Sequence, residues 1–367
     1  MKIVAAVTRE PHQRFCVEEV DLIGPKDNEI LVRIEAVGLC HSDILVVEQV
    51  LPVSLPAVLG HEGAGVVEAV GSKVTKVKPG DKVVMTFNSC GTCASCKKNE
   101  PAYCLNWAAL NYGGARADGS PTICSCGAPV SGNFFGQSSF ARYALGHERN
   151  VVKVADNAVL TLLGPLGCGI QTGAGAVMRS LAAEPDSSII VFGGGSVGLA
   201  AVMGAKVMKC KEIILVEPMP ERRKLGIELG ATHAIDPKEG NVVARIREIL
   251  PAGANYAVDT SGAVPAIQDA ADSLGMRGKL GLVGVPSKVD AAFNFNILSF
   301  LSRGLRVQAI IEGDSVPDDF IPELVNLHME GKLPLEKLVQ TYPFAEINRA
   351  VEEQKKGICV KAVLVFE

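Results

Sequence analysis

Hydrophobic and polar positions divide the chain into two regions with different periods. In residues 1–150, short segments rich in β-branched side chains are separated by turns that contain Gly, Pro and Asp. This pattern predicts a mostly β domain with Pro and Gly at its corners. The clearest strands are expected over residues 30–34, 65–71 and 79–84, and the glycine-rich residues 105–146 are expected to form loops.

From about residue 187 onward, short apolar segments alternate with longer helical ones. A strand over 189–192, a helix ending near residue 209 and a strand over 212–217 form one βαβ unit, whose strands pair in parallel through a right-handed crossover. Further helices are expected over residues 220–229, 241–250 and 264–274, and further strands over 233–235, 256–259, 280–285 and 307–311. The alternation predicts a doubly wound parallel sheet.

The C-terminal segment is expected to return to the first domain, with a helix over residues 320–329 and a strand over 361–366. The predicted fold class is therefore α/β. The first domain is expected to comprise residues 1–169 and 311–367, and the second, parallel-sheet domain residues 170–310. A length of 367 residues is consistent with two domains, since single cores rarely grow beyond about 300 residues.

Composition narrows the possible partners. With 36 basic and 40 acidic residues, the chain shows no excess positive charge for nucleic acid or an anionic membrane, so a small soluble ligand is expected. The uncharged stretches 157–178 and 187–205 are long enough for a membrane span, but Pro165 and many glycines indicate backbone packing instead. The apolar run at the N-terminus is too short for a secretion signal, and we expect a cytoplasmic location.

The eleven cysteines include four in one short loop, at Cys90, Cys93, Cys96 and Cys104. Four thiolates at this spacing can bind one tetrahedral zinc ion, while disulfides or packed thiols are the alternatives. Four sulfur ligands leave no open position, so the expected site is structural. The Cys124 and Cys126 pair, with one residue between, suits a shared metal poorly.

A glycine motif marks a dinucleotide site in the second region. Gly193, Gly195 and Gly198 follow a predicted strand and open a predicted helix, and Glu217 ends the next strand. In such a site the glycines allow a tight turn, close approach of the pyrophosphate and helix–strand packing, and the acid accepts hydrogen bonds from ribose hydroxyls. Glu217 favours NAD over NADP, whereas the positive charges of the nearby Arg222 and Arg223 favour NADP. The alternative is that the glycines serve packing alone.

Three further candidate metal ligands, Cys40, His61 and Cys168, are weak signals individually. Together with the segments Cys40-His41-Ser42-Asp43 and Gly60-His61-Glu62-Gly63, the four-cysteine loop, residues 167–173 and the dinucleotide unit, they occur in one order over the whole chain. In this respect the sequence resembles the zinc-dependent medium-chain alcohol dehydrogenases. The resemblance implies a GroES-like, mostly β catalytic domain, a Rossmann domain that binds NAD, and two zinc ions per chain.

The family pattern also implies roles for individual residues near the metal. Cys40, His61 and Cys168 would bind a catalytic zinc with one open position. Asp43 resembles the acid that hydrogen-bonds the histidine ligand, and Ser42 the hydroxyl that receives the alcohol proton. Glu62 resembles a carboxylate behind the metal, with anchoring of its loop as the alternative.

One position departs from the family pattern. Many members have a histidine a few residues after the serine to relay the proton to solvent, whereas this chain has Leu45 at the matching place. The proton is therefore expected to leave through another route, such as nicotinamide-ribose hydroxyls and water. The resemblance also implies a set of cofactor contacts, namely His41, Thr172, Val197, Arg222, Val283 and Lys361.

The residues that line the substrate pocket are less clearly indicated by the sequence. Phe87 resembles a pocket residue when counted from Asp81 but is one place off when counted back from Cys90, and Trp107 and Phe140 either face the pocket or pack elsewhere. Residues 167–175 and 310–313 look most like the aryl- and benzyl-alcohol branch. Primary aromatic or allylic alcohols and their aldehydes are therefore expected. The alternatives are short aliphatic alcohols, a glutathione-dependent formaldehyde dehydrogenase, and a non-catalytic nucleotide-binding relative. A homodimer or homotetramer is expected.

Overall fold

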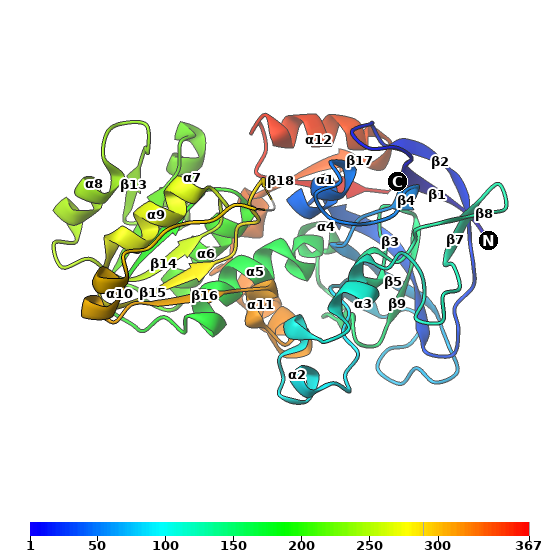
Figure 1. The fold of residues 1–367 in the computed structure, drawn as a ribbon. Coiled ribbons are helices and arrows are strands. Elements are labelled where there is room, and N and C mark those ends of the chain that lie inside the picture. Colours follow the sequence, from blue (N-terminus) through cyan, green and yellow to red (C-terminus); the bar gives the residue numbers. More distant parts are fainter. Residues whose placement is uncertain (289, 367) are drawn as a thin grey trace. The chain divides into compact units, whose positions relative to one another are not determined.

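The structure is a computed structural model that describes residues 1–288 and 290–366 of the chain (Figure 1). Contacts divide it into two compact units. The first consists of Met1–Cys168, Val316–Met329 and the segment from Leu335 to the C-terminal end, and the second of Gly169–Ser315 and Glu330–Pro334. The boundaries expected after residues 169 and 310 thus fall after residues 168 and 315, and the short return of 330–334 was not anticipated.

The first unit is built mainly from strands. Its helices are short, except for two near the C-terminal end: α1 (His41–Val47), α2 (Ala94–Lys97), α3 (Trp107–Tyr112), α4 (Leu160–Leu163), α11 (Pro317–Met329) and α12 (Ile347–Lys355). Its strands are β1 (Lys2–Thr8), β2 (Cys16–Leu22), β3 (Glu29–Gly38), β4 (Ala57–Val58), β5 (Gly63–Val70), β6 (Lys82–Met85), β7 (Ile123–Ser125), β8 (Ala128–Val130), β9 (Tyr143–His147), β10 (Val151–Lys153), β17 (Val339–Pro343) and β18 (Lys361–Val365).

Two sheets organise these strands. One has the order β4-β1-β2-β7-β8, and the other has the order β10-β6-β5-β3-β18-β17 with β9 also paired to β3. Strand β3 pairs with three neighbours, and most of its side chains are buried, while the charged Glu29, Arg33 and Glu35 are half-buried. The antiparallel pairing of β18 with β3 confirms that the C-terminal strand returns to this unit.

The second unit is a parallel sheet flanked by helices. Its strands are β11 (Ser188–Phe192), β12 (Glu212–Val216), β13 (His233–Ile235), β14 (Ala254–Asp259), β15 (Leu274–Leu282) and β16 (Arg306–Ala309), and its helices are α5 (Gly169–Gly175), α6 (Ser196–Val207), α7 (Pro220–Leu229), α8 (Val242–Ile249), α9 (Val264–Ser273) and α10 (Ile297–Arg303). All pairings are parallel, in the order β13-β12-β11-β14-β15-β16. This is the strand order of dinucleotide-binding doubly wound sheets.

The central strand of this sheet is buried on both faces, since all five residues of β11 are buried. Helix α6 packs against α5 and α7, and α8 packs against α9, which is consistent with helices on the two faces of the sheet (Figure 1). The expected strands and helices between residues 189 and 285 are confirmed within a few residues at most ends, although β15 begins at Leu274. Helix α10 was not predicted. Among the helices of residues 1–288 and 290–366, none combines the length and apolar content needed to cross a bilayer.

Candidate metal centres and cofactor site

Cys40, His61 and Cys168 come together in the first unit, although 128 positions separate the two cysteines. Cys40 directly precedes α1, His61 follows Gly60 just before β5, and Cys168 follows the turn Gly164–Gly167. One ligand atom from each of them and one from Glu62 lie within 4.8 Å of one another. The two sulfurs are 4.0 Å apart. Two ligands at about 2.3 Å from a tetrahedral zinc would lie about 3.8 Å apart, so the spacing fits this ion.

Asp43 determines the orientation of the His61 ring. The Nδ1 atom of His61 lies 3.0 Å from Oδ1 of Asp43, which also accepts a hydrogen bond from the Gly60 amide at 3.0 Å. Oδ2 accepts from the Cys40 amide, also at 3.0 Å. Because Asp43 accepts a hydrogen bond from Nδ1, the proton of the neutral imidazole lies on Nδ1 and the lone pair lies on Nε2. This buried Nε2 has no hydrogen-bond partner within the described residues. An unpartnered buried nitrogen next to two thiols is suited to metal ligation.

The ionisable groups of this cluster shift one another's pKa values. A hydrogen bond from Cys168 and the positive charges of His61 and Lys361 outweigh burial and hold the pKa of Cys40 well below its usual value. Burial alone would lower the pKa of His61, but the charges of Asp43 and Cys40 outweigh it and raise that pKa. The thiolate of Cys40 and the charged form of His61 therefore stabilise one another.

Glu62 faces Lys361 behind this cluster. The ammonium nitrogen of Lys361 lies 2.8 Å from Oε1 and 2.7 Å from Oε2 of Glu62, and it donates to the Leu39 carbonyl oxygen at 3.1 Å. Burial raises the pKa of Glu62 to about 7, with the Lys361 charge opposing it. Lys361 itself is only 1% exposed. This buried, paired position differs from the phosphate contact predicted for Lys361 and anchors Glu62 instead.

Helix α1 carries the remaining residues predicted near the metal. The Ser42 hydroxyl lies 3.9 Å from the Cys40 sulfur, and its side chain is half-buried. His41 is exposed, and Leu45 is buried within the apolar core of the unit. Because Leu45 is apolar and buried, it offers no relay, and any proton accepted by Ser42 needs a different route outward.

The four cysteines of the loop also converge. One sulfur from each of Cys90, Cys93, Cys96 and Cys104 lies within 4.8 Å of the others, and all are in the described part of the chain without a disulfide. Backbone amides donate to these sulfurs, among them the Cys93 amide to Cys90 and the Cys90 amide to Cys104, both at 3.3 Å. Gly91, with φ of 71°, allows the chain to curl around the sulfurs.

The thiols of this loop differ in their tendency to ionise. The Thr92 hydroxyl and backbone amides lower the pKa of Cys90 to about 5, whereas burial raises the pKa of Cys96 to about 12. Four thiolates together are therefore unfavourable without a cation, and a divalent ion such as zinc would remove this penalty.

The glycine motif lies between β11 and α6. Gly193 has φ of 100°, and a Cβ atom on Gly198 would lie 1.8 Å from the Gly193 carbonyl oxygen, so this glycine is required for close packing. A Cβ atom on Gly195, in contrast, would meet nothing within 4 Å. This open position, at the N-terminus of a twelve-residue helix, fits the approach of a pyrophosphate.

Glu217, at the end of β12, lies next to the motif. Its Oε2 accepts from the Gly194 amide at 2.5 Å and its Oε1 from the Met219 amide at 2.8 Å. Arg223 pairs with Asp236 at 2.9 Å, whereas the buried Nε of Arg222 has no hydrogen-bond partner within the described residues. Of the other predicted contacts in this unit, Val197 is half-buried at the start of α6, Thr172 is buried in α5, and Val283 follows β15, where its amide donates to the Asp259 carbonyl.

An aromatic cluster adjoins His61 in the first unit. Phe87 and Trp107 are 5.2 Å apart between ring centroids, and Trp107 also contacts Phe135 at 6.0 Å. Phe135 in turn stacks on the His61 imidazole at 4.4 Å. Phe87 and Trp107 therefore belong to the aromatic group that reaches the metal cluster. Sequence reasoning missed Phe135, because an aromatic residue in a loop carries no mark of the direction in which it points.

Phe140 does not belong to this group. Its ring is completely buried and packs against Phe15 at 5.6 Å, while its backbone hydrogen-bonds to Leu59 and Ala6. Phe140 is thus part of the core of the first unit, and its prediction as a substrate-pocket residue is wrong. The backbone pairing of residue 140 with two neighbouring segments leaves its side chain on the core side.

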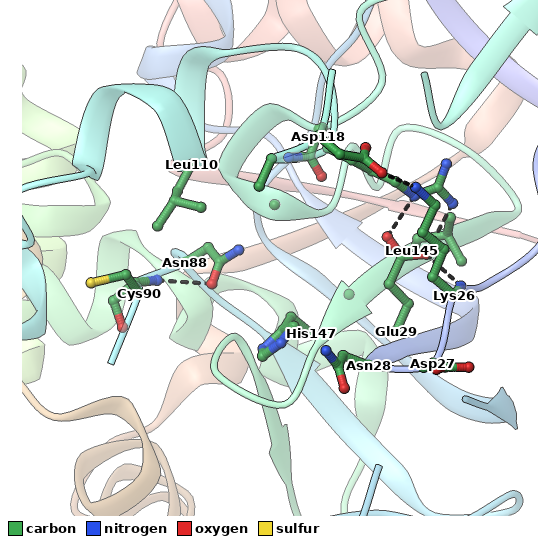
Figure 2. Close-up of a pocket in the computed structure, with 16 residues that line it drawn as sticks. Lys26, Asp27, Asn28, Glu29, Asn88, Cys90, Leu110, Asp118, Leu145 and His147 are labelled. Atoms are coloured by element: carbon green, nitrogen blue, oxygen red, sulfur yellow. Dashed lines mark hydrogen bonds and ion pairs between the residues drawn. The ribbon is translucent and has the colours of Figure 1, made fainter. Parts of the chain in front are cut away.

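A separate cavity of about 640 Å³ lies beside the cysteine loop, with Cys90 in its lining (Figure 2). Its Lys, Arg, Asp and Glu side chains are all paired, Lys26 with Asp118, Arg116 with Glu29, and Asp27 with Lys73. Cys90 and His147 also line it, but Cys40, His61 and Cys168 do not. With its charges neutralised internally and without the convergent ligands of the cluster, this cavity is not the site of the chemistry.

A mostly β unit with two groups of metal-ligating side chains, joined to a dinucleotide-binding sheet, defines the class of zinc- and nicotinamide-dependent oxidoreductases. Comparisons with known proteins agree. The family model described as "Alcohol dehydrogenase GroES-like domain" matches residues 26–156, and that described as "Zinc-binding dehydrogenase" matches residues 196–328. The chain is 46% identical over 364 residues to a geraniol dehydrogenase of Castellaniella defragrans, covering 99% of this chain and 97% of that protein.

Solved structures extend this similarity. A zinc-binding alcohol dehydrogenase domain protein of Burkholderia ambifaria matches with a TM-score of 0.98 and 48% identity, covering 100% of this chain and 99% of the other. The benzyl alcohol dehydrogenase of Acinetobacter calcoaceticus matches with a TM-score of 0.96 and 41% identity, each chain covered completely. The chain therefore belongs to the zinc-dependent medium-chain alcohol dehydrogenases, and it acts on small alcohols with zinc and a nicotinamide cofactor.

Proposed function

We propose that this alcohol dehydrogenase interconverts primary aromatic or allylic alcohols and their aldehydes, with NAD as the hydride carrier. The observation that carries the proposal is the convergence of Cys40, His61 and Cys168, with the buried Nε2 of His61 unpartnered. The choice of substrate is supported by the names of two similar proteins, a geraniol dehydrogenase and a benzyl alcohol dehydrogenase. The aromatic group of Phe87, Trp107 and Phe135 beside His61 also suits an unsaturated, flat substrate.

The residues of the cluster would hold the catalytic zinc. Cys40 and Cys168 would bind as thiolates and His61 through Nε2, leaving one position for the substrate oxygen. When bound, zinc acts as a Lewis acid that lowers the pKa of the alcohol, and the nicotinamide accepts the hydride. Ser42, whose hydroxyl lies 3.9 Å from the Cys40 sulfur, would accept the alcohol proton as it passes its own proton outward.

The cysteine loop would hold a second, structural zinc. Cys90, Cys93, Cys96 and Cys104 supply four ligands, so this ion has no open position and takes no part in the reaction. Two zinc ions per chain are therefore expected. Ligation through four reduced thiolates also favours a reducing compartment, and we infer a cytoplasmic location.

Glu217 supports NAD as the preferred cofactor. A carboxylate at the end of the second strand of the sheet accepts hydrogen bonds from ribose hydroxyls and repels a 2′-phosphate. Its two oxygens already accept from the Gly194 and Met219 amides, which keep the carboxylate at the glycine motif. Replacing Glu217 with Gln is expected to raise the KM for NAD and to narrow the preference over NADP.

An exposed surface of the second unit supports assembly into a homodimer or homotetramer. Strand β16 is at the edge of its sheet, and the adjoining helix α10 exposes Ile297, Leu298 and Leu301 at 73–76%. An exposed sheet edge beside such an apolar surface is suited to pairing with a second copy. Analytical ultracentrifugation of Leu301→Glu would test this surface, with a shift toward monomer as the expected result.

A substrate panel tests the central proposal. Purified enzyme with NAD would be assayed with benzyl, cinnamyl, geranyl and short aliphatic alcohols by following reduced nicotinamide, with Cys40→Ser as the inactive control. The highest kcat/KM is expected for an aromatic or allylic alcohol. A clear preference for short aliphatic alcohols, or turnover only with a glutathione adduct, would refute the substrate proposal. Full activity and zinc content in Cys40→Ser would refute the metal site.

A further inference from the structure

The face of the His61 imidazole is covered by the ring of Phe135. The two ring centroids are 4.4 Å apart, with an angle of 23° between the planes. Phe134 meets the same imidazole nearly at right angles, at 5.3 Å and 89°. His61 is completely buried and Phe135 is 3% exposed. The stack therefore lies within a packed interior, where a change of ring orientation would require its neighbours to move.

The backbone at Phe135 has an unfavourable conformation for an aromatic residue. Its φ of 51° and ψ of 31° lie in the left-handed region, which non-glycine residues rarely adopt. The buried Asn150 amide nitrogen donates to the carbonyl oxygens of Phe135 at 3.2 Å and Gly136 at 3.0 Å, and the Ser138 hydroxyl accepts from the Phe134 amide at 2.9 Å. A costly conformation held by several hydrogen bonds next to a reactive site suggests a functional reason.

Besides Phe134, whose ring centroid lies 4.9 Å from that of Phe135 at an interplanar angle of 74°, two aromatic side chains of α3 hold the Phe135 ring in place. Trp107 contacts it at 6.0 Å with an interplanar angle of 86°, and Tyr112 contacts it at 5.7 Å with an angle of 75°. Both residues belong to α3, at opposite ends of that helix. These T-shaped contacts hold the ring from the side of α3, while its face stacks on His61.

The imidazole is thus constrained in two independent ways. Asp43 accepts a hydrogen bond from Nδ1 of His61 at 3.0 Å and so fixes the tautomer of the imidazole. Phe135 stacks on the imidazole and fixes the plane of the ring. We propose that Phe135 is a positioning residue for the metal ligand His61. By holding the imidazole plane, it directs Nε2 toward the sulfurs of Cys40 and Cys168 before a metal binds. A ligand ordered in advance loses less freedom on binding, so the catalytic zinc is held more tightly.

This inference rests on the proposed catalytic zinc site, and its test measures metal affinity rather than turnover. Zinc would be titrated against a chelator of known affinity at equilibrium, because a smaller side chain at position 135 also changes the access of the chelator and hence the rates. The unchanged enzyme should bind two zinc ions per chain and Cys40→Ser one, which identifies the catalytic ion. Phe135→Leu keeps apolar volume but removes the aromatic face.

The expected result is a loss of about tenfold in affinity for the catalytic zinc in Phe135→Leu, as is common when a group that orients a ligand is removed. Phe135→Tyr, which retains the ring, should restore the original affinity. Phe15→Leu is the control, because it removes a buried ring of the same unit that packs against Phe140 in the apolar core, and the affinity for the catalytic zinc should stay close to the original.

Three results would overturn the positioning role: unchanged affinity in Phe135→Leu, an equal loss in Phe15→Leu, or no recovery in Phe135→Tyr. If circular dichroism shows that Phe135→Leu does not fold, Tyr112→Leu decides the question, since it removes one support of the ring. A weaker catalytic site is then expected, and unchanged affinity would overturn the proposal. If Cys40→Ser retains both zinc ions, the assignment of the metal site fails, whatever Phe135 does.

Discussion

The ammonium nitrogen of Lys361 lies 2.7 Å from Oε2 of Glu62, and the two side chains are 1% and 0% exposed. The residues are 299 positions apart, so strand β18 must be paired with β3 for them to meet. A buried pair of this kind adds little net stability compared with apolar residues, but removing one partner leaves an uncompensated charge in the interior.

Replacing Lys361 with Met should therefore lower the free energy of unfolding by about 3–5 kcal/mol. Urea denaturation would measure this, and the double variant Glu62→Gln with Lys361→Met should recover part of the loss. Lys355→Met is the control, because its exposed ion pair with Glu48 at 2.8 Å should contribute no more than about 1 kcal/mol. A loss in Lys361→Met no larger than in the control would contradict the argument.

The glycines of the dinucleotide motif should respond differently to alanine. Gly195→Ala adds a methyl group where nothing lies within 4 Å, so the protein should fold normally, but NAD binding should weaken about tenfold as the backbone can no longer approach the pyrophosphate. Gly198→Ala places its methyl group 1.8 Å from the Gly193 carbonyl oxygen and should destabilise the second unit. Calorimetric NAD titration and thermal melting separate the two effects. Unchanged NAD affinity in Gly195→Ala would argue against pyrophosphate binding at this turn.

Replacing a single cysteine of the loop should be enough to release its zinc ion. Cys104→Ser is expected to reduce zinc content from two ions to one and to lower the Tm by roughly 5–10 °C, because metal ligation contributes directly to folding. Cys124→Ser removes a cysteine outside both ligand groups and should change neither quantity. Elemental analysis and thermal melting provide the measurements, and two zinc ions in Cys104→Ser would show that the loop is not a zinc site.

His147 should contribute to the pH dependence of stability. Burial lowers the pKa of His147 below its ordinary value of 6.5, with the nearby Arg149 and Lys76 charges acting in the same direction and Glu148 and Glu29 opposing them. Below pH 6.5 the unfolded state binds the proton before the folded state does, so the stabilising contribution is complete above this pH and is lost as the pH falls toward the lower folded pKa.

The variant His147→Gln should accordingly show a smaller loss of unfolding free energy between about pH 7.5 and about pH 5.5 than the unchanged enzyme. Urea denaturation at both pH values gives the comparison. Parallel pH profiles for the enzyme and His147→Gln would exclude this contribution.

Sequence patterns predicted the second unit better than the first. Its strands are short apolar segments between longer helices, so the period changes clearly at each boundary. Helix α10 was missed because it has only seven residues, even though Asn296 caps it and Gly304 ends it with φ of 61°. In the first unit, α1 was missed because it is only seven residues long and is preceded by Cys40 rather than by a usual capping residue.

The sequence by itself determined the features whose parts lie close together along the chain. The ligands at Cys90, Cys93, Cys96 and Cys104 fall within one loop, and the glycine motif within one turn, so local geometry suffices to recognise them. Only the tertiary structure decided how distant or unmarked side chains are used. Strand pairing brings Lys361 to Glu62, and the turn at Phe135 directs one ring onto His61 while Phe140 enters the core. Side-chain direction in a loop depends on backbone dihedrals and packing partners, which residue type alone does not specify.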